Sequence, residues 1–438
     1  MKKKALLAML LAVTLLMSSC GLVVKHDDVD QKRAIITLDG EVQYTKAEVQ
    51  SQVNYYLSYM SYYYSMFGYS FDTTSADNIS DAQDAVIEGL QQEAIINREA
   101  ASLGLTLTDE ESAAGTTLED KLEDAVTADI TVTDEELETE LASKVESDKT
   151  TFESTPNTYG TRVNNGTAVY YRPAGYRMVR NLLIQYEEAD LRLTTALRTN
   201  VSSQTSAAST ASTAVTGATA TDLEELTFYV TVTVTEAAEQ ATTMTDLGET
   251  IVVPTYTATT EDTFPATEDE DTLTLYENVK AYAMAQALQA KYQEALDAAS
   301  AAGLANIQEK TDAAMARLDA GEDFVTVMTE LTDDPGMTTK PDGYAVREGF
   351  TSFDTPFVTA AMSLANVGDY SQPTAGMYGY YIVQYASEVT EGAVDLSEVR
   401  DTLYDSLLAD KKDEAFDAQL EQWIADAKWV INKDALND

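Results

Sequence analysis

The pattern of hydrophobic and polar positions predicts a mostly helical domain over residues 34–150. A short apolar run at its start ends in Asp39-Gly40, a turn dipeptide, which predicts one strand followed by a turn. Glu48 follows Thr45 at the spacing of a capping box, and this predicts the start of a helix. Further helix signals, one apolar-periodic stretch and two Thr-Asp-Glu-Glu motifs, lie at 80–103, 108–111 and 133–136.

The middle of the chain changes character several times. Residues 177–185 form an apolar run, which predicts a buried strand. Residues 200–221 are almost wholly Ser, Thr, Ala and Gly, and because they have little to bury we predict a flexible segment. Alternation with period two over 228–235 predicts another strand, for which 251–256 is a candidate partner. An Ala-rich helix is predicted over 273–302, ending at the glycine that follows.

The last third of the chain combines helices and strands. From 306 to 390 the pattern predicts two helices, a loop, a short helix and a strand, and that strand is the aromatic and β-branched run 377–385. Residues 396–427 carry apolar positions at helical spacing and predict a final amphipathic helix. The chain as a whole is therefore predicted to be α+β.

Residues 1–20 have the pattern of an export signal. Lysines precede a short apolar run at 5–17, and Ser-Ser-Cys-Gly follows at 18–21. The run is too short to cross a membrane as a helix. Its ending resembles the bacterial lipobox, which implies that Cys20 is lipidated and becomes the mature N-terminus. The alternatives are plain cleavage and an uncleaved anchor, and the polar residues 21–33 are interpreted as a tether.

Charge and residue usage exclude several classes of function. The 438 residues include 28 Lys and Arg against 74 Asp and Glu, a formal net charge of −46. Nucleic acid is therefore not an expected partner, because phosphates are contacted through clusters of Lys and Arg. A single cysteine excludes an internal disulfide. His26 is the single histidine, so a Cys/His zinc cluster or a Ser-His-Asp triad would have to use it, and we interpret it as a solvated residue of the tether. We expect no metal and no cofactor.

Five short fragments carry the most specific signal. They are a strand Val-Arg-Asn-Leu-Leu-Ile, a helix entry Gly-Glu-Asp-Phe, an acidic loop Asp-Asp-Pro-Gly, a helix Phe-Val-Thr-Ala-Ala-Met-Ser-Leu followed by Gly and Ser-Gln-Pro, and a strand Tyr-Gly-Tyr-Tyr-Ile-Val. They lie in this order at 179–184, 321–324, 333–336, 357–373 and 378–383. Together they resemble the parvulin family of peptidyl-prolyl isomerases.

With a lipobox upstream and helical segments on either side, the chain resembles an extracytoplasmic foldase of the PrsA/SurA type. The resemblance implies a helical chaperone-like domain formed by 34–170 and 391–438. It also implies an inserted parvulin-like domain, a small antiparallel sheet with helices, formed by 171–186 and 306–390. Residues 187–305 are far more than the family needs and are interpreted as an insertion, with a flexible segment, a β segment and an Ala-rich helix.

The resemblance also locates a proline pocket above two strands that are far apart in sequence but expected to lie side by side. Asp334 matches the acidic position of the family pocket, whereas its two histidines are replaced by Asn181 and Tyr381, expected to hydrogen-bond across neighbouring strands. Isomerisation needs no covalent step, because a pocket lowers the amide barrier of ~18–20 kcal/mol by binding the twisted amide best. The substrate-binding wall is predicted to consist of Phe353, Phe357 and Met362.

Three other features have two interpretations each. The tyrosine-dense stretch 55–69 is either a client-binding surface or, as we prefer, a helix that packs Tyr55, Tyr59, Tyr62 and Met66 on its own core. Asp334 is either a pocket acid or the cap of the turn before Pro335. The acidic runs near 261–262 and 268–271 are interpreted as solvated loops, with calcium binding at 269–271 as the alternative.

The sequence therefore predicts a lipid-anchored folding factor on the extracytoplasmic face of the cell membrane. Its expected partners are unfolded or partly folded exported proteins, bound through X-Pro segments. Replacement of both pocket histidines leaves isomerase activity open, so a catalytically inactive chaperone or scaffold that keeps the parvulin fold as a peptide-binding module is the alternative. A surface lipoprotein whose insertion binds an envelope partner is a third hypothesis. A homodimer through the helical domain is left open by the family resemblance.

Overall fold

The computed structural model describes residues 30–437, except 215–219, 238–241 and 245–250. The predicted signal peptide, Cys20, His26 and nearly all of the tether lie outside the described residues. In the part that is described, no helix has the length and apolar character needed to span a membrane. The chain forms two compact units, one up to Leu141 together with everything from Leu396 onward, and the other Ala142–Asp395.

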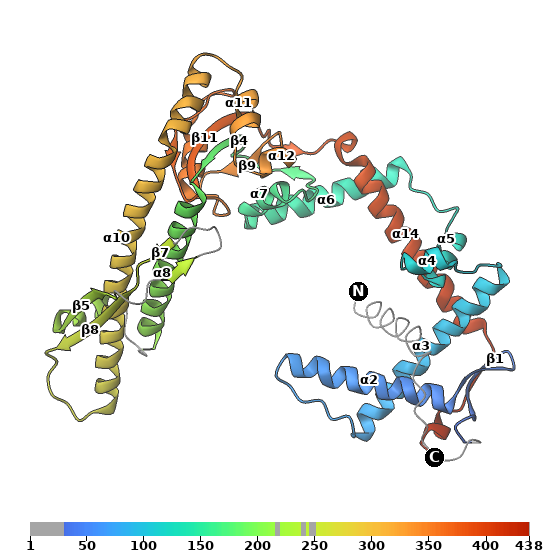
Figure 1. The fold of residues 1–438 in the computed structure, drawn as a ribbon. Helices are drawn as coiled ribbons and strands as arrows, with labels where there is room; N and C mark the ends of the chain where they lie inside the picture. The colour runs from blue at the N-terminus through green and yellow to red at the C-terminus, as the bar shows by residue number, and fades with distance from the viewer. Residues whose placement is uncertain (1–29, 215–219, 238–241, 245–250, 438) are drawn as a thin grey trace. The chain divides into compact units, whose positions relative to one another are not determined.

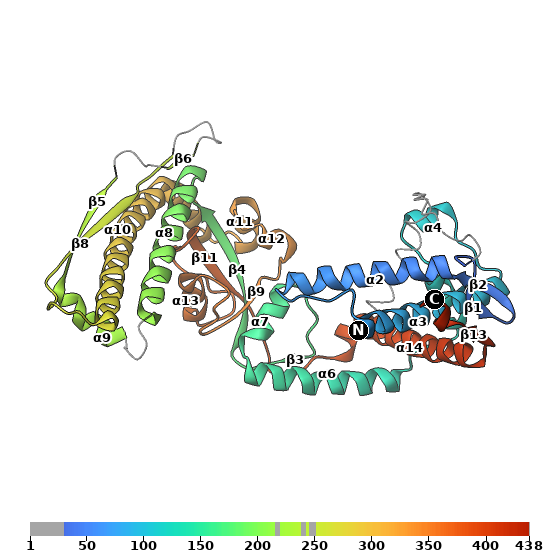
Figure 2. The same cartoon turned by 90° about the horizontal axis from the view of Figure 1, so that it is seen from below.

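The first unit contains a small sheet that joins both ends of the chain. Strand β1 (Ala34–Leu38) lies between β2 (Glu41–Thr45) and β13 (Trp429–Ile431), and both neighbours are antiparallel to it. The predicted turn follows β1, and its residues Asp39 and Gly40 have φ angles of 51° and 94°. Figure 2 shows the three strands together. The N- and C-terminal segments therefore form one unit, as the fold-class prediction stated.

Helices make up the rest of this unit, and three of them begin where the capping motifs predict. The Thr108 and Thr133 motifs form capping boxes, with Glu111 and Glu136 accepting the Thr backbone N–H groups at 2.8 Å in both cases. Glu48 accepts the backbone N–H of Thr45 in the same way. The elements are α2 (Lys46–Met66), α3 (Ala76–Ser102), α4 (Asp109–Ala113), α5 (Leu118–Val126), the start of α6 (Asp134–Ser154), α14 (Leu396–Asp426) and η3 (Lys433–Leu436).

The boundary between the units falls inside α6 rather than near residue 170. The second half of α6 and α7 (Asn157–Asn164) pack on the second unit, where Phe152 and Tyr159 join Tyr176 in one buried aromatic cluster. Because these large rings are buried against the sheet, α7 belongs to that unit. The predicted helical domain is therefore shorter at this end than 34–170.

The second unit is built on a four-stranded antiparallel sheet with the order β10-β11-β4-β9. Its two central strands come from distant parts of the chain, and Tyr381 of β11 lies opposite Leu183 of β4. The prediction that these two stretches lie side by side is confirmed. The elements around the sheet are β3 (Tyr171–Arg172), β4 (Tyr176–Gln185), α11 (Phe324–Leu331), α12 (Gly336–Thr339), β9 (Tyr344–Arg347), α13 (Thr355–Ser363), β10 (Thr374–Ala375), β11 (Gly379–Glu388) and β12 (Gly392–Ala393).

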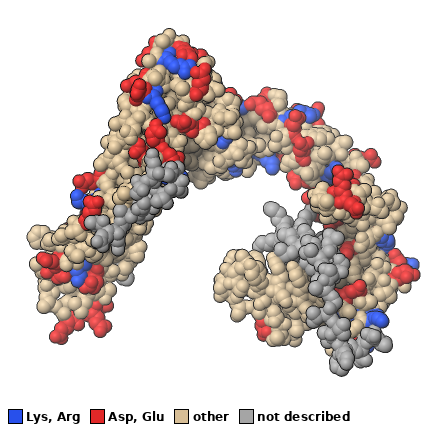
Figure 3. Space-filling model, viewed as in Figure 1, with Lys and Arg blue, Asp and Glu red and all other residues tan. Residues whose placement is uncertain are grey.

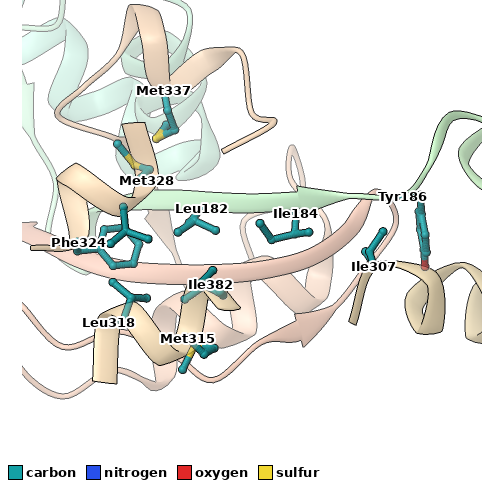
Figure 4. Packing of buried hydrophobic residues seen from close by; sticks show 12 residues of the cluster. Leu182, Ile184, Tyr186, Ile307, Met315, Leu318, Phe324, Met328, Met337 and Ile382 are labelled. Atoms are coloured by element: carbon teal, nitrogen blue, oxygen red, sulfur yellow. The ribbon is translucent and has the colours of Figure 1, made fainter. Parts of the chain in front are cut away.

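Alternate residues of β4 point to opposite faces of this sheet. Leu182 and Ile184 lie on one face and pack against α10 and α11, as the buried side chains in Figure 4 show. Val179 and Leu183 lie on the other face and pack against α13. Asn181 shares the face of Val179 and Leu183, so a polar side chain is placed in the middle of an otherwise apolar surface.

An arm of two long helices projects from this sheet, and it differs from the prediction for the insertion. Helix α8 (Glu188–Thr213) begins just after β4 and runs beside α10 (Glu270–Asp319), as Figure 1 shows. The prediction of a flexible segment from residue 200 was wrong as far as Thr213. Ala208 and Ala211 are buried in a cluster with residues of α10, and Thr hydroxyls bond back to carbonyls one turn earlier.

Helix α10 also continues past the glycine at which it was predicted to end. Gly303 lies inside the helix, where a Cβ would come within 2.8 Å of the Tyr186 ring, so the glycine permits close packing rather than a stop. The boundary of the predicted insertion at residue 305 therefore falls within one continuous helix. Asp269 caps its N-terminus by accepting the Thr272 backbone N–H at 2.9 Å.

The arm carries two short hairpins. The strand predicted over 228–235 is β5, and its partner is β8. Of the predicted partner 251–256, residues 251–253 form β7 and only Tyr256 belongs to β8, where it pairs with Glu236. Val230 to Glu236 pair in full register with Tyr256 to Asp262, which gives β5 a longer ladder than a three-residue strand offers. The elements are α9 (Ala220–Leu226), η2 (Thr227–Tyr229), β5 (Val230–Glu236), β6 (Thr242–Met244), β7 (Ile251–Val253) and β8 (Tyr256–Asp262).

Candidate functional site

A cavity of about 890 Å³ lies over the β4–β11 face of the second unit. Five of the six predicted pocket residues line it, and they come from β4, the loop before α12, the start of α13 and β11. These residues are Asn181, Asp334, Phe353, Phe357 and Tyr381. The structure therefore brings together in one hollow residues that are up to two hundred positions apart in sequence. Their catalytic and substrate-binding roles remain predictions.

The acidic loop before α12 is held by the edge of β4. Strand β9 pairs only with Tyr176 to Val179, which leaves the edge of β4 beyond it without a strand partner. There the Leu183 N–H donates to the Thr332 hydroxyl at 3.1 Å, and the Gln185 N–H donates to the Asp333 carboxylate at 3.0 Å. Buried backbone groups need such partners, so this loop is fixed against the strand.

Asp334 is the centre of one hydrogen-bond network at the cavity. The Asn181 carboxamide donates to one carboxylate oxygen at 2.9 Å, and the Tyr344 hydroxyl donates to the other at 2.9 Å. The second oxygen also accepts the Gly336 N–H at 2.9 Å and so closes the turn at Pro335. Asp334 therefore caps the turn before Pro335 and also lines the cavity, and its role as a pocket acid stays a prediction.

Asp354 is the centre of a second network on the opposite side. Its carboxylate accepts the Tyr381 hydroxyl at 3.0 Å and the Met377 backbone N–H at 2.5 Å. Asn181 and Tyr381 were predicted to hydrogen-bond across neighbouring strands, and this prediction was wrong, because each side chain donates to a carboxylate outside the sheet. Val383, not Tyr381, is the residue opposite Asn181, and each polar side chain finds its own carboxylate.

Glycines allow both networks to close. A Cβ at Gly336 would lie 1.7 Å from the Tyr344 hydroxyl, and a Cβ at Gly376 would lie 2.1 Å from the Tyr381 ring. Neither distance is compatible with a side chain, so the backbone approaches each tyrosine as only glycine permits. The position of each phenol in the cavity wall depends on its glycine.

Both phenols remain protonated at neutral pH. Burial raises the pKa of Tyr344 and of Tyr381, and the charge of Asp334 or Asp354 and the hydrogen bond to it raise the pKa further. Each hydroxyl therefore keeps its proton and donates a hydrogen bond to its carboxylate. The hydroxyl oxygens remain as acceptors for a ligand.

The apolar wall of the cavity is a cluster of aromatic rings. Phe353 lies 4.9 Å from Tyr344 and 5.4 Å from Phe357 between ring centroids, and Phe357 lies 5.7 Å from Tyr381. Such spacings are those of favourable ring pairs. Phe357 is buried, and Phe353 is half-buried and lines the opening. The wall is apolar enough to hold a proline ring.

Met362 was predicted to belong to the substrate-binding wall, and this prediction was wrong. It does not line the cavity and instead packs behind the aromatic cluster. It follows Phe357 by five residues, which places it about 140° further around α13. The sequence analysis missed Tyr344, Asp354 and Met377. Asp354 precedes Thr-Pro at the start of α13, a signal that predicts a helix start and gives no indication of a cavity.

The cavity is negatively charged. Three carboxylates, those of Asp333, Asp334 and Asp354, line it, and its wall contains neither Lys nor Arg. The buried Asn181, 5% exposed, contributes a carboxamide oxygen that has no donor within the described residues. The site thus offers an apolar wall, several acceptors and negative potential. In the described part of the chain, no group of three or more His, Cys, Asp or Glu side chains is arranged to hold a metal ion.

A second surface feature lies at the end of the α2–α3 hairpin in the first unit. Our preferred interpretation, that its tyrosines pack on the domain core, was wrong. Tyr62, Met66 and Tyr69 are 65%, 64% and 69% exposed, whereas Val53 and Leu57 face the core. Residues 49–71 contain no charged side chain, and Figure 3 shows this end of the hairpin as an area almost without charge. Aromatic patches of this kind are unusual on a monomeric protein.

The fold and the cavity define the class of the second unit. It contains a four-stranded antiparallel sheet whose central strands come from distant segments, with helices on both faces. An aromatic cavity lies over β4 and β11. This is the arrangement expected of a parvulin-like domain.

Sequence comparison leads to the same class. Foldase protein PrsA of Clostridium tetani is 29% identical over 130 residues, which cover 30% of this chain and 38% of that protein. Foldase protein PrsA of Clostridium acetobutylicum is 28% identical over 138 residues, or 31% of this chain and 40% of that protein. The chain is similar to these PrsA foldases over about 30% of its own length, and the match spans about two fifths of the length of these relatives.

Solved structures with similarity to this chain include a PrsA peptidylprolyl isomerase from Bacillus anthracis and a SurA-like chaperone from Campylobacter jejuni. The first is 14% identical with a TM-score of 0.17, covering 69% of this chain and 92% of that one. The second is 13% identical with a TM-score of 0.19, covering 90% and 98%. No protein-family model matches the chain.

Proposed function

We propose that the protein is an extracytoplasmic folding factor whose second unit binds proline-containing segments of unfolded exported proteins. The observation that carries this proposal is the convergence of Asn181, Asp334, Phe353, Phe357 and Tyr381 on one cavity. A proline ring is apolar, and its tertiary amide lacks an N–H, so it fits a hollow lined by aromatic rings and acceptors. The relationship to PrsA foldases supports the same class of client.

Binding is the activity that the cavity supports best, and isomerisation follows from it only weakly. A twisted prolyl amide is stabilised when a donor reaches its nitrogen or its carbonyl oxygen. The Tyr344 and Tyr381 hydroxyls donate to carboxylates instead, and the Asn181 carboxamide gives one of its two N–H groups to Asp334. The second form of the proposal, a peptide-binding module with little or no isomerase activity, is favoured by this observation.

The exposed aromatic end of the α2–α3 hairpin gives the first unit a second way to hold clients. Tyrosine and phenylalanine offer large apolar area at low entropic cost, and tyrosine tolerates water. Rings in this area contact one another, with Tyr63 and Phe67 at 5.2 Å and Tyr64 and Phe71 at 5.3 Å between centroids. A pre-ordered cluster of rings suits apolar segments of many sequences.

Titration of the full chain with a fluorescent peptide that contains one proline tests the cavity. We expect the peptide to bind more tightly than its Pro→Ala analogue, and Phe353→Ala to weaken binding about tenfold, which corresponds to about 1.4 kcal/mol. Phe228→Ala is the matched control, because Phe228 is 89% exposed on the arm. Equal binding of the two peptides, or equal loss in both variants, would refute the proposal. A protease-coupled assay with the same peptide then measures isomerase activity.

We also propose that the protein is anchored by a lipid at Cys20. The motif at 18–21 supports this, since the cysteine directly follows an apolar run and two small residues. Cys20→Ala is expected to move the protein from the membrane fraction to the medium or to leave an uncleaved precursor. Fractionation followed by mass determination checks this, and a variant that fractionates and migrates like the wild type would contradict it.

A further inference from the structure

The cavity does not end at the sheet. A second hollow of about 540 Å³ is lined by Met377 and Tyr378, which also line the first, and by one face of α8 between Thr195 and Ser206. The two hollows therefore adjoin at Met377 and Tyr378, and together they lead from the proline cavity towards the arm. The α8 side of the second hollow is rich in Ser and Thr hydroxyls, which both donate and accept hydrogen bonds.

Helix α8 is fixed in this position by contacts at its base. The Tyr186 hydroxyl donates to the Gly376 carbonyl at 3.3 Å, directly beside the shared wall. Lys310 of α10 forms an ion pair with Glu187 at 2.9 Å, and the Asn306 carboxamide donates to Asp190 at 2.8 Å. The start of α8 is thus tied to both the sheet and α10, so the second hollow belongs to the packed structure of this unit.

Arg198 is the charged residue in this second hollow, and it has no carboxylate partner among the described residues, although its charge acts on the Tyr186 phenol. In the described part of the chain it has neither a hydrogen bond nor an ion pair, although it is half-buried. Arg192, six residues earlier on the same helix, pairs with Glu188 at 2.7 Å. In a protein with a net charge of −46, an arginine without a carboxylate is unexpected. A half-buried guanidinium gains most from a charge-assisted bond to a planar carboxylate.

The charges of the two hollows are complementary to one kind of ligand. The first is lined by three aspartates and by no basic side chain, and the second is lined by Arg198 and by no acidic one. A carboxylate on a bound peptide is therefore repelled near the proline and attracted at α8. The charges of the two hollows therefore determine at which position of a bound peptide an acidic residue strengthens binding.

We infer that a client segment runs from the proline cavity across Met377 and Tyr378 onto α8, where Arg198 binds an Asp or Glu side chain of the client. The Ser and Thr hydroxyls beside Arg198 hydrogen-bond the client backbone and so accept many sequences. This inference rests on the proposed function, since it extends the same cavity. It gives the arm, which the family resemblance does not require, a role in choosing acidic segments that flank proline.

The test uses the full chain and labelled peptides that contain one proline. In each peptide a single Glu occupies one position before or after the proline, and its binding is compared with that of a peptide with Gln at the same position. At one position, several residues from the proline, Glu is expected to bind about threefold to tenfold more tightly than Gln, which is the range for a charged hydrogen bond at a half-buried site. Arg198→Gln is expected to abolish this difference. Arg198→Glu is expected to reverse it in favour of Lys, a gain that a misfolded variant does not show.

Arg192→Gln is the matched control, and it should leave the preference for Glu unchanged. The inference would be overturned if binding depends on proline but no position prefers Glu, or if the preference for Glu persists in Arg198→Gln. Either result would leave the proposed function standing. Absence of proline-dependent binding in the wild type would overturn both.

Discussion

Asp354 connects two sides of the cavity through single hydrogen bonds. It precedes the first turn of α13, but its carboxylate binds the Tyr381 hydroxyl on β11 and the Met377 N–H in the preceding loop. Tyr381 is 3% exposed, so its hydroxyl has little access to water. A buried donor that loses its acceptor carries its full desolvation free energy without the compensating hydrogen bond. One carboxylate thus fixes the aromatic wall and the rim shared by both hollows.

Asp354→Ala is expected to lower the free energy of unfolding by about 1–3 kcal/mol, because the Tyr381 hydroxyl and the Met377 N–H lose their acceptor. It is also expected to weaken binding of proline peptides, because the rim becomes mobile. Asp342→Ala, an exposed aspartate in a nearby loop, is the control and should change stability by less than about 0.5 kcal/mol. Urea unfolding measures both, and similar values for the two variants would contradict the assigned role of Asp354.

Residue patterns located most of this cavity but not its polar contacts. Asn181, Asp334, Phe353, Phe357 and Tyr381 were placed by short motifs whose spacing reflects strand and helix positions. Tyr344 and Asp354 were missed because a hydrogen bond between distant segments leaves no local signal. Met362 was misplaced because helix periodicity decides which face a residue occupies, and a motif match does not contain that information.

At the scale of elements, capping motifs determine where helices begin and long-range packing determines where they end. The motif at Thr133 starts α6, and Glu136 there also binds Lys411 of α14 at 2.5 Å. The Lys411 hydrogen bond, followed by the bonds from Thr133, lowers the pKa of Glu136 from 4.5 to about 2. The same contact therefore caps one helix and attaches another.

The lowered pKa of Glu136 predicts a pH dependence of stability. A carboxylate whose pKa is lower in the folded state stabilises the fold above its unfolded pKa, and that contribution is lost as the pH falls. The wild type should therefore be more stable than Lys411→Gln above about pH 4.5, and the two should converge towards pH 2. Lys412→Gln is the control, because its partner Asp124 is an exposed carboxylate. If the unfolding midpoints of the wild type and Lys411→Gln differ by the same amount at every pH between 2 and 7, the assigned role of Glu136 is contradicted.

Helix α8 shows why the arm was not predicted from local sequence. A segment of Ser, Thr and Ala has little apolar area, so composition alone favours a flexible chain. In the structure it lies against α10, where small side chains allow close packing and Leu197 is buried with Tyr292 and Leu296. The partner that makes the helix stable begins nearly sixty residues after α8 ends. Local composition cannot indicate such a partner.

At the scale of the whole molecule, the proposed function gives the chain two separate ways of contacting an unfolded protein. The first unit exposes an uncharged aromatic patch at the end of the α2–α3 hairpin, and the second contains the proline cavity with its extension onto α8. We propose that the patch binds apolar segments without selectivity, whereas the two hollows select by proline and charge. A formal net charge of −46 makes copies of the chain repel one another electrostatically.

The triple variant Tyr62→Gln, Met66→Gln and Tyr69→Gln tests the patch. It is expected to suppress aggregation of an unfolded client less well than the wild type, because exposed apolar area is removed, while stability changes by no more than about 0.5 kcal/mol per site. A control triple at other exposed apolar positions, Phe228→Gln, Leu273→Gln and Val367→Gln, should retain the activity. Equal activity of the two triples, measured by light scattering, would exclude the patch as a client site.

The central claim is that proline segments bind over the β4–β11 sheet, and hydrogen–deuterium exchange of the full chain with a proline peptide tests it most directly. The account predicts slower exchange at 332–336, 351–357 and 376–381 with the proline peptide, and a smaller effect with its Pro→Ala analogue. Unchanged exchange in these segments under saturating peptide, or slowing confined to the first unit, would contradict it.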